Sequence, residues 1–360
     1  MAPGAGGGGL MRYFCTYFDE NYLPRGLALY ASLARVAGPF RLWVLCLSTE
    51  CFDALTKLAL PNMVPVPMDA LQRGDDALLA AKASRSRIEY YFTCTPSLLR
   101  YVLRNEPAAD LVTYLDADLY FFSDPAPVFD EVADHSAGII GHRFPPHLRH
   151  KEVYGTYNVG WVSIRRDAEG ERCLEWWRQR CNEWCYDRCE PGRFADQKYL
   201  DAWPERFANV RVIQHVGANL APWNVGNYRV RRGPSGVTVD GQPLVFFHFH
   251  RFRQLNAWIF DPNLDEYAAR SSPALERGIF APYHAALLEA NQRAAAVVAR
   301  AGTAPHDIRY QRASRHGAAP SLASRVRERA RSARTISRAL LTRRWILSAP
   351  QVFGGGVKAL

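Results

Sequence analysis

The stretch Leu-Val-Thr-Tyr-Leu-Asp-Ala-Asp-Leu-Tyr-Phe-Phe-Ser-Asp-Pro, residues 111–125, decides the fold that we expect for this chain. Its first five residues form an apolar, β-favouring run that is typical of a strand buried on both faces. Asp116 and Asp118 follow the run, and residues i and i+2 of an extended chain point to the same side. Two neighbouring carboxylates in a semi-buried place repel each other unless a cation lies between them. The stretch therefore predicts a divalent-metal site for an anionic ligand, although either Asp could instead start a turn or cap a helix.

Around this stretch, strand-like apolar runs alternate with segments of helical periodicity. We expect strands at residues 13–18, 41–47, 64–66, 137–141, 157–164, 210–215 and 244–249. We expect helices at residues 23–37, 50–60, 96–104, 127–132 and 168–189, the third of them with Pro96 in its first turn. Alternating strands and helices predict an α/β fold, in which helices flank a mostly parallel sheet on both faces.

The positive charge of the chain is concentrated at its carboxyl end. Residues 309–360 hold 12 Arg or Lys and one acid, whereas the first 308 residues hold 33 basic and 34 acidic residues. The neutral body argues against a nucleic-acid-binding core. No apolar run approaches the roughly 20 residues of a membrane-spanning helix. Residues 1–9 lack the pattern of an export signal, so we expect a cytoplasmic protein.

Histidine and cysteine offer further candidate metal ligands. His248 and His250 end an apolar strand and fall on one side of an extended chain, where a buried structural His is the alternative. Two carboxylates and one imidazole suit Mn²⁺ somewhat better than Mg²⁺. The cysteines at 181, 185 and 189 would share one face of a helix, but no Cys-x₂-Cys pair or nearby His completes a zinc site.

Five motifs in order along the chain resemble the retaining sugar-nucleotide glycosyltransferases of the GT-A fold, notably glycosyltransferase family 8, which includes glycogenin and bacterial lipopolysaccharide galactosyltransferases. The motifs are Asp-Glu-Asn-Tyr (19–22), Tyr-Leu-Asp-Ala-Asp (114–118), Tyr-Asn-Val-Gly (157–160), Ala-Asp-Gln (195–197) and His-Phe-His (248–250). The resemblance covers about residues 12–260. It implies a hexosyltransferase that moves a sugar, with retention, from a nucleotide-diphosphate donor (expected to be a UDP-sugar) to a glycan or lipid-linked acceptor.

The resemblance also implies roles for individual residues. Asp116, Asp118 and His248 would bind the metal, with His250 as the alternative ligand. The base and ribose would be held by Thr16, Tyr17, Asp19 and Asn21. The donor sugar would be contacted by Asn158 and Gly160. Asp196 and Gln197 would lie beside the anomeric carbon, on the face opposite the leaving group.

Two departures from the family concern the diphosphate. The Arg that the family usually has in the helix before the metal strand is missing, and the candidates to replace it are Arg85, Arg87 and Arg100. The family's Gly after the His is also replaced, and Arg251 or Arg253 could then reach a phosphate.

The remaining segments complete the expected organisation. We expect a disordered N-terminus (1–11), a GT-A domain (12–260), a helical extension (261–302) and a basic tail (303–360). Residues 322–345 have the pattern of a basic amphipathic helix that would bind anionic lipid, with a solvated arm as the alternative. Binding to lipid would place the protein at the inner face of the membrane, in polysaccharide or lipopolysaccharide biosynthesis. The competing functions are a sugar-1-phosphate nucleotidyltransferase and a non-catalytic nucleotide-sugar or glycan-binding protein.

Overall fold

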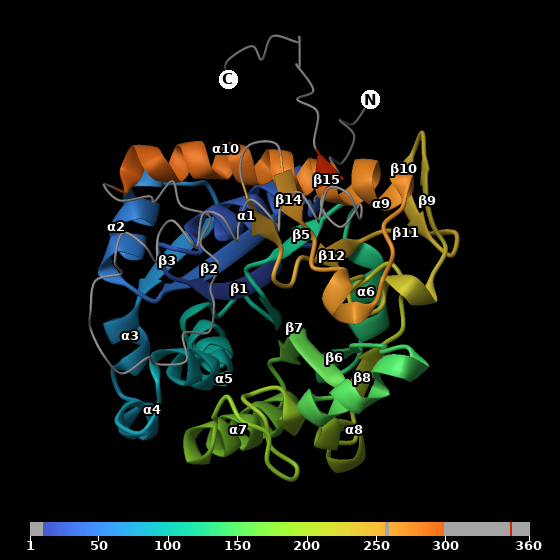
Figure 1. Ribbon diagram of the computed structural model, residues 1–360. Coiled ribbons are helices and arrows are strands. Elements are labelled where there is room, and N and C mark those ends of the chain that lie inside the picture. Colours follow the sequence, from blue (N-terminus) through green and yellow to red (C-terminus); the bar gives the residue numbers. More distant parts are fainter. Residues whose placement is uncertain (1–9, 256–258, 299–345, 348–360) are drawn as a thin grey trace, which may run out of the picture.

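A seven-stranded sheet forms the centre of the protein, whose computed structural model describes residues 10–255, 259–298 and 346–347 (Figure 1). Its strands lie in the order β3-β2-β1-β4-β7-β6-β8. Their bounds are β1 Arg12–Phe18, β2 Phe40–Cys46, β3 Met63–Pro67, β4 Leu111–Leu115, β6 Ala137–Gly141, β7 Tyr157–Arg165 and β8 Val210–Ile213. Strand β7 runs antiparallel to both of its neighbours, and the other pairs are parallel. The prediction of an α/β fold with a mostly parallel sheet is confirmed.

Helices cover both faces of this sheet. One face carries α1 Leu23–Val36, α2 Thr49–Leu58, α6 Ala126–Val132 and α10 Ala281–Val297. The other carries α3 Met68–Gln72, α4 Asp76–Lys82, α5 Arg87–Asn105, α7 Ala168–Glu183 and α8 Trp203–Arg206. Because α10 places Ala290 and Ala294 in the same apolar cluster as residues of β1 and α1, the predicted helical extension packs on the core sheet.

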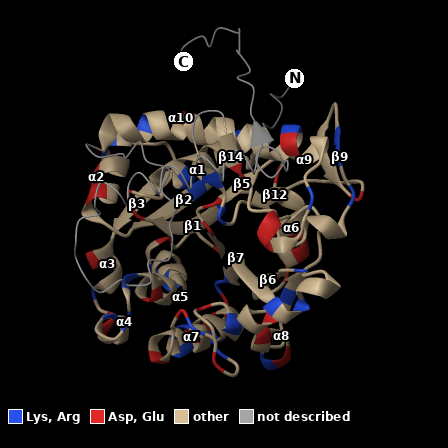
Figure 2. Ribbon diagram, in the orientation of Figure 1, with Lys and Arg blue, Asp and Glu red and all other residues tan. Residues whose placement is uncertain are grey.

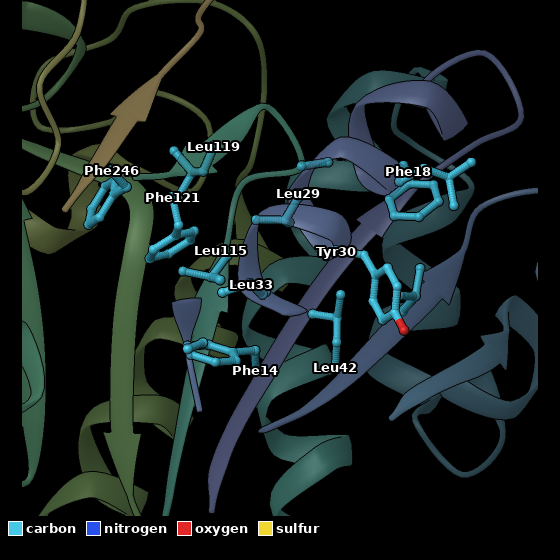
Figure 3. Packing of buried hydrophobic residues seen from close by; sticks show 14 of the residues in the cluster. Phe14, Phe18, Leu29, Tyr30, Leu33, Leu42, Leu115, Leu119, Phe121 and Phe246 are labelled. Carbon is cyan, nitrogen blue, oxygen red and sulfur yellow. The ribbon is translucent and has the colours of Figure 1, made fainter. Parts of the chain in front are cut away.

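The side chains of β1 alternate between the two faces, as the period of a strand requires. Phe14 and Phe18 point to the face of α1, whereas Cys15 and Tyr17 belong to the cluster on the other face. Figure 3 shows Leu29 and Leu33 of α1 in the same cluster as Phe14. Each fully buried side chain of this size contributes about 1.5–3 kcal/mol relative to its exposed state. Burial on both faces explains why the central strands are continuous apolar runs.

Helix α5 is longer than predicted. It begins at Arg87 and holds Pro96 in its interior, so the prediction of Pro96 in a first turn is wrong. Its start is fixed by Glu89, which accepts a hydrogen bond from the backbone N–H of Ser86 (2.8 Å). A proline inside a helix costs about 3 kcal/mol. The buried apolar side of the helix, which includes Leu98 and Leu99, offsets this cost.

Helix α7 is shorter than predicted, because it ends at Glu183 and Trp184 is extended. The three cysteines at 181, 185 and 189 therefore do not share a helical face: the first two are buried and the third is exposed. Figure 2 shows acidic and basic residues interspersed on α7 and α8, as in the ion pair of Arg180 with Glu183 (2.7 Å).

Short elements complete the described chain. Strand β5 (Leu119–Phe121) pairs antiparallel with β12 (Phe246–His248). Small sheets are formed by β9 Val230–Gly233, β10 Gly236–Val239 and β11 Gln242–Pro243, and by β13 Arg253–Gln254, β14 Ile259–Asp261 and β15 Ile346–Leu347. Segment 142–154 contains the 3-10 helix η1 (Pro146–Tyr154), and a second 3-10 helix, η2, spans Lys198–Ala202. Before α10 lie the one-turn helix α9 (Pro273–Leu275) and a π-helical turn, Glu276–Phe280.

The predicted amphipathic helix at 322–345 lies outside the described residues. Among the helices that the structure does describe, none is both long and apolar enough to cross a membrane.

Candidate functional site

Asp116 and Asp118 lie in a tight turn between β4 and β5, at the carboxyl end of the central strand. The backbone N–H of Leu119 donates to the carbonyl of Asp116 (3.2 Å), so the segment is a turn and the expected extended geometry is wrong. The backbone N–H of Asp116 donates to the carbonyl of Gly160 on β7 (3.3 Å). The turn is thus tied to the neighbouring strand.

His248 brings an imidazole to both carboxylates. It ends β12, opposite Leu119 of β5, and its side chain is buried. Its Nε2 lies 3.1 Å from Oδ1 of Asp118 and 3.5 Å from Oδ2 of Asp116. His250 lies nearby, and ligand atoms of Asp118, His248 and His250 all lie within 4.8 Å of one another. Three of the residues that the sequence predicted as metal ligands, Asp118, His248 and His250, therefore form one cluster, and Asp116 approaches this cluster through His248.

The distances from His248 Nε2 to the two carboxylates suit pairs of ligands on one divalent ion. Two ligand atoms at about 2.1 Å from one ion, in adjacent octahedral positions, are about 3 Å apart. The separations between His248 Nε2 and the two carboxylates are close to that value. In the protonated imidazole a proton occupies the space between Nε2 and the carboxylates, and a metal would take the place of that proton.

Asn158 fixes the orientation of the imidazole. Its Oδ1 lies 3.2 Å from His248 Nδ1 and accepts a hydrogen bond from the N–H of Gly160 (3.0 Å). A ligand His commonly donates its second N–H to such an acceptor, which leaves the other nitrogen free for the metal. A Cβ at Gly160 would lie 2.5 Å from Asn158 Oδ1 and 2.9 Å from His248 Nδ1, so this contact requires glycine.

The two carboxylates have opposite pKa shifts. Burial raises the pKa of Asp116 to about 6, with the charge of His248 opposing the shift and that of Asp118 adding to it. Burial also acts to raise the pKa of Asp118, but the charge of His248 and a hydrogen bond from it outweigh burial and lower the pKa to about 2. Burial lowers the pKa of His250 to about 4, so its ring is neutral at pH 7. The cluster thus combines carboxylate and imidazole ligands that can bind a cation.

Asp196 forms a second acidic centre. Its Oδ2 accepts a hydrogen bond from the hydroxyl of Thr95 (2.7 Å), and its backbone carbonyl accepts one from Trp177 Nε1 (2.8 Å). Burial raises the pKa of Asp196 to about 7, and the charge of Asp116 adds to the shift. A carboxyl group with a pKa near 7 can hold or release a proton at neutral pH.

The side chain of Gln197 connects three segments. Its Oε1 accepts hydrogen bonds from Asn158 Nδ2 (3.2 Å) and the N–H of Val159 (3.4 Å), and its Nε2 donates to the carbonyl of Tyr154 (3.0 Å). Strand β7 and the 3-10 helix η1 therefore hold this amide in place.

The residues predicted for the nucleotide lie at the carboxyl end of β1, but their side chains diverge. Thr16 is fully buried, and its hydroxyl has no hydrogen-bond partner among the residues that the structure describes. Tyr17 points to the other face, where its ring centroid lies 5.6 Å from that of Tyr114. Asp19 Oδ1 accepts from the backbone N–H groups of Asn21 (3.0 Å) and Tyr22 (3.1 Å). The structure thus brings Tyr17 towards the acidic centres and gives Asp19 a role in the turn.

Sequence reasoning missed four neighbours of the site. The hydroxyl of Tyr114 donates to Asp116 Oδ1 (3.0 Å), and Thr95 bonds Asp196. The ring centroid of Trp223 lies 5.0 Å from that of His248 and 5.6 Å from that of His250. The fourth neighbour is Arg25, whose charge interacts with Asp118. Tyr114 is part of the motif at 114–118, whereas no local sequence signal points to Arg25.

Most of the arginines considered for the diphosphate are bonded elsewhere. Arg85 donates to the carbonyl of Asn182 and stacks on Tyr186, and Arg100 forms ion pairs with Asp75 and Glu175. Arg251 pairs with Glu266, and Arg253 pairs with Asp261. The remaining candidate, Arg87, is exposed at the first residue of α5.

Comparison with known proteins gives relatives and structural neighbours. No protein-family model matches the chain. Two proteins of Bacillus subtilis (strain 168), both described as uncharacterized, are similar: YfnF is 34% identical over 248 residues, 67% of this chain and 81% of YfnF. YfnD is 31% identical over 274 residues, 75% of this chain and 87% of YfnD. The structure of the galactosyltransferase LgtC with donor and acceptor sugar analogs is 14% identical, with a TM-score of 0.49, and the match covers 80% of this chain and 96% of that one.

Proposed function

The chain belongs to the family of the Bacillus subtilis proteins YfnF and YfnD, and we propose that it is a metal-dependent glycosyltransferase. The proposal depends on one observation, the cluster in which His248 Nε2 faces Asp116 and Asp118 at the carboxyl end of β4. The five motifs that resemble family 8 support it. The donor would be a nucleotide-diphosphate sugar, for which we propose a UDP-hexose, and the acceptor a glycan or lipid-linked sugar, with retention at the anomeric carbon.

The metal ligands proposed are Asp116, Asp118 and His248, with His250 as the alternative to His248. A bound Mn²⁺ or Mg²⁺ would act as a Lewis acid towards the negative charge that develops on a departing diphosphate. Asn158 and Gly160, predicted to contact the sugar, have a second role in this proposal, because they hold the ring of His248.

Asp196 and Gln197 are the proposed catalytic pair. A carboxyl group with a pKa of about 7 can donate a hydrogen bond to a sugar hydroxyl when protonated and stabilise positive charge when ionised. The amide of Gln197 is held by contacts on both sides, so it can present a fixed dipole to the anomeric carbon. Tyr17, Asp19 and Asn21 would contact the base and ribose. Thr16, whose side chain points to the other face of β1 from that of Tyr17, would support this strand from within the core.

The proposed organisation keeps the GT-A domain at residues 12–260, followed by the extension and the basic tail. Residues 322–345 are proposed to bind anionic membrane surfaces, which would bring a lipid-linked acceptor of polysaccharide or lipopolysaccharide biosynthesis to the site. We propose a cytoplasmic location with peripheral attachment at the inner membrane face.

A panel of UDP-, GDP- and TDP-sugars tests the function. The melting temperature of the full chain and the release of nucleoside diphosphate would be measured with Mn²⁺, with Mg²⁺ and with EDTA. We expect stabilisation by at least one donor, because a ligand selective for the folded state raises its melting temperature, and slow donor hydrolysis with metal only. Binding without any turnover, when candidate acceptors are also supplied, would contradict the enzyme and favour a non-catalytic binding protein.

A further inference from the structure

Arg25 is a partly buried cation in the first turn of α1. Its Nη2 donates to the carbonyl of Phe252 (2.9 Å), and its guanidinium carbon lies 4.5 Å from the ring centroid of Tyr22. Among the residues that the structure describes, no other hydrogen bond of this side chain is found, which leaves several of its five N–H donors for another partner.

The carbonyl to which Arg25 bonds belongs to the turn that leaves the metal cluster. The N–H of Phe249, directly after His248, donates to the carbonyl of Asp118 (2.9 Å), and the N–H of Phe252 donates to the carbonyl of Phe249 (3.0 Å). The guanidinium therefore lies against the same short turn that carries His250. Burial acts to lower the pKa of Arg25, but Tyr22, Tyr283 and Asp118 together raise it, in agreement with a charge close to Asp118.

Tyr22 places the same guanidinium beside the proposed nucleoside site. The backbone N–H of Tyr22 bonds Oδ1 of Asp19, in the turn at the end of β1. Arg25 thus lies between the turn proposed for the base and ribose and the cluster proposed for the metal. A diphosphate joins a nucleoside to a sugar and would cross this interval.

Charge balance favours a cation there. Two ionised carboxylates and one divalent ion sum to zero, so the metal cluster by itself leaves the charge of a diphosphate uncompensated. An Arg with free donors matches phosphate oxygens in geometry and charge. The arginines at 85, 100, 251 and 253 are engaged in other contacts.

We infer that Arg25 binds the diphosphate of the nucleotide, in place of the arginine that the family has before its metal strand. This inference rests on the proposed function and assigns the diphosphate contact to α1. Arg25 would hold the phosphates in both the bound donor and the released nucleoside diphosphate.

The test is calorimetric titration of UDP, GDP and TDP into the full chain with saturating Mn²⁺, followed by the matching nucleoside alone. Arg25→Gln keeps a polar side chain but removes the charge, and Arg25→Lys restores the charge. Because charge-assisted hydrogen bonds contribute about 1.5–3 kcal/mol, we expect Arg25→Gln to weaken the nucleoside diphosphate by about 10- to 100-fold. Arg25→Lys should recover part of the loss, and affinity for the nucleoside should change by less than about threefold, since the nucleoside lacks the phosphates.

Arg35→Ala is the matched control, because Arg35 lies on the same helix, stacks on Tyr120 and bonds the carbonyl of Phe121, away from the cluster. With Mn²⁺ present, Arg25→Gln could still bind the nucleoside diphosphate with an affinity within about twofold of that of the unchanged protein. This result would overturn the role of Arg25 and leave the proposed function intact. Equal losses for diphosphate and nucleoside would also overturn it, because they indicate general damage to the site. If the unchanged protein binds none of the three diphosphates with Mn²⁺, the proposed function fails as well.

Discussion

Asp118 and Asp196 are both buried carboxylic acids near the carboxyl ends of the central strands, yet their pKa values move in opposite directions. Asp118 faces the imidazole of His248, and its pKa is lowered to about 2. Asp196 faces the hydroxyl of Thr95 without a cation in contact among the described residues, and burial raises its pKa to about 7. The difference shows that the partner of a buried acid sets its pKa, and with it whether the acid stays ionised, as a metal ligand must, or can bind and release a proton near pH 7.

The largest expected effect comes from Asp118→Ala. Removing this carboxylate takes away a proposed metal ligand and leaves His248 without its nearest charge, so donor turnover should fall by about 1,000-fold or more. The measurement is release of nucleoside diphosphate with Mn²⁺. Asp110→Asn is the control, because Asp110 is an exposed acid at the opposite end of β4, paired with Arg165. Turnover that survives Asp118→Ala would separate this acid from the chemistry.

The Mn²⁺ affinities of His248→Ala and His250→Ala can be compared to test which imidazole is the metal ligand. His248 Nε2 lies between both carboxylates, so its loss should weaken Mn²⁺ binding by about 100-fold, and the loss of His250 by less than about tenfold. Mn²⁺ affinity can be followed by electron paramagnetic resonance of the free ion. The reverse order would make His250 the ligand.

Asp196→Asn should change the pH dependence of stability. Because the folded-state pKa of Asp196 is raised, its contribution to stability is complete below about pH 4 and is lost as pH rises towards about 7. Each unit of pKa shift corresponds to about 1.4 kcal/mol, so the contribution of Asp196 to the free energy of unfolding should be a few kcal/mol lower at pH 8 than at pH 4. Urea unfolding at pH 5 and pH 8 should show this loss in the unchanged protein and a smaller one in Asp196→Asn. Identical pH profiles for the two proteins would mean that Asp196 is ionised normally.

The smallest expected effect is that of Thr95→Val, which keeps the shape of the side chain and removes its hydrogen bond to Asp196. The lost bond should lower the free energy of unfolding by about 1 kcal/mol at pH 8, where Asp196 is ionised, and by less at pH 5. Urea titrations at the two pH values measure this difference. An equal loss at both would indicate that Thr95 acts through packing alone.

The sequence was a good guide to the elements and a partial guide to the site. Continuous apolar runs predicted the central strands, because a strand buried on both faces needs apolar side chains at every position. Helix α5 was misplaced because the proline signal at Pro96 outweighed the start at Ser86. Thr16 and Tyr17 could not be separated by their types, since only the pleat of β1 decides that Thr16 is buried under α1.

By itself the sequence determined that two aspartates follow the central strand and that two histidines end a later one, because neighbours along a chain keep their spacing in any fold. Only the tertiary structure showed that both imidazoles lie near Asp118 and that His248 also approaches Asp116, through the pairing of β12 with β5 and the space that Gly160 leaves beside His248. It also placed Arg25 against the turn after His248, a contact between segments far apart in the chain. Strand register, burial and contacts between distant segments set these distances and the pKa values that follow from them. The spacing of residues along the chain does not reveal any of these three factors.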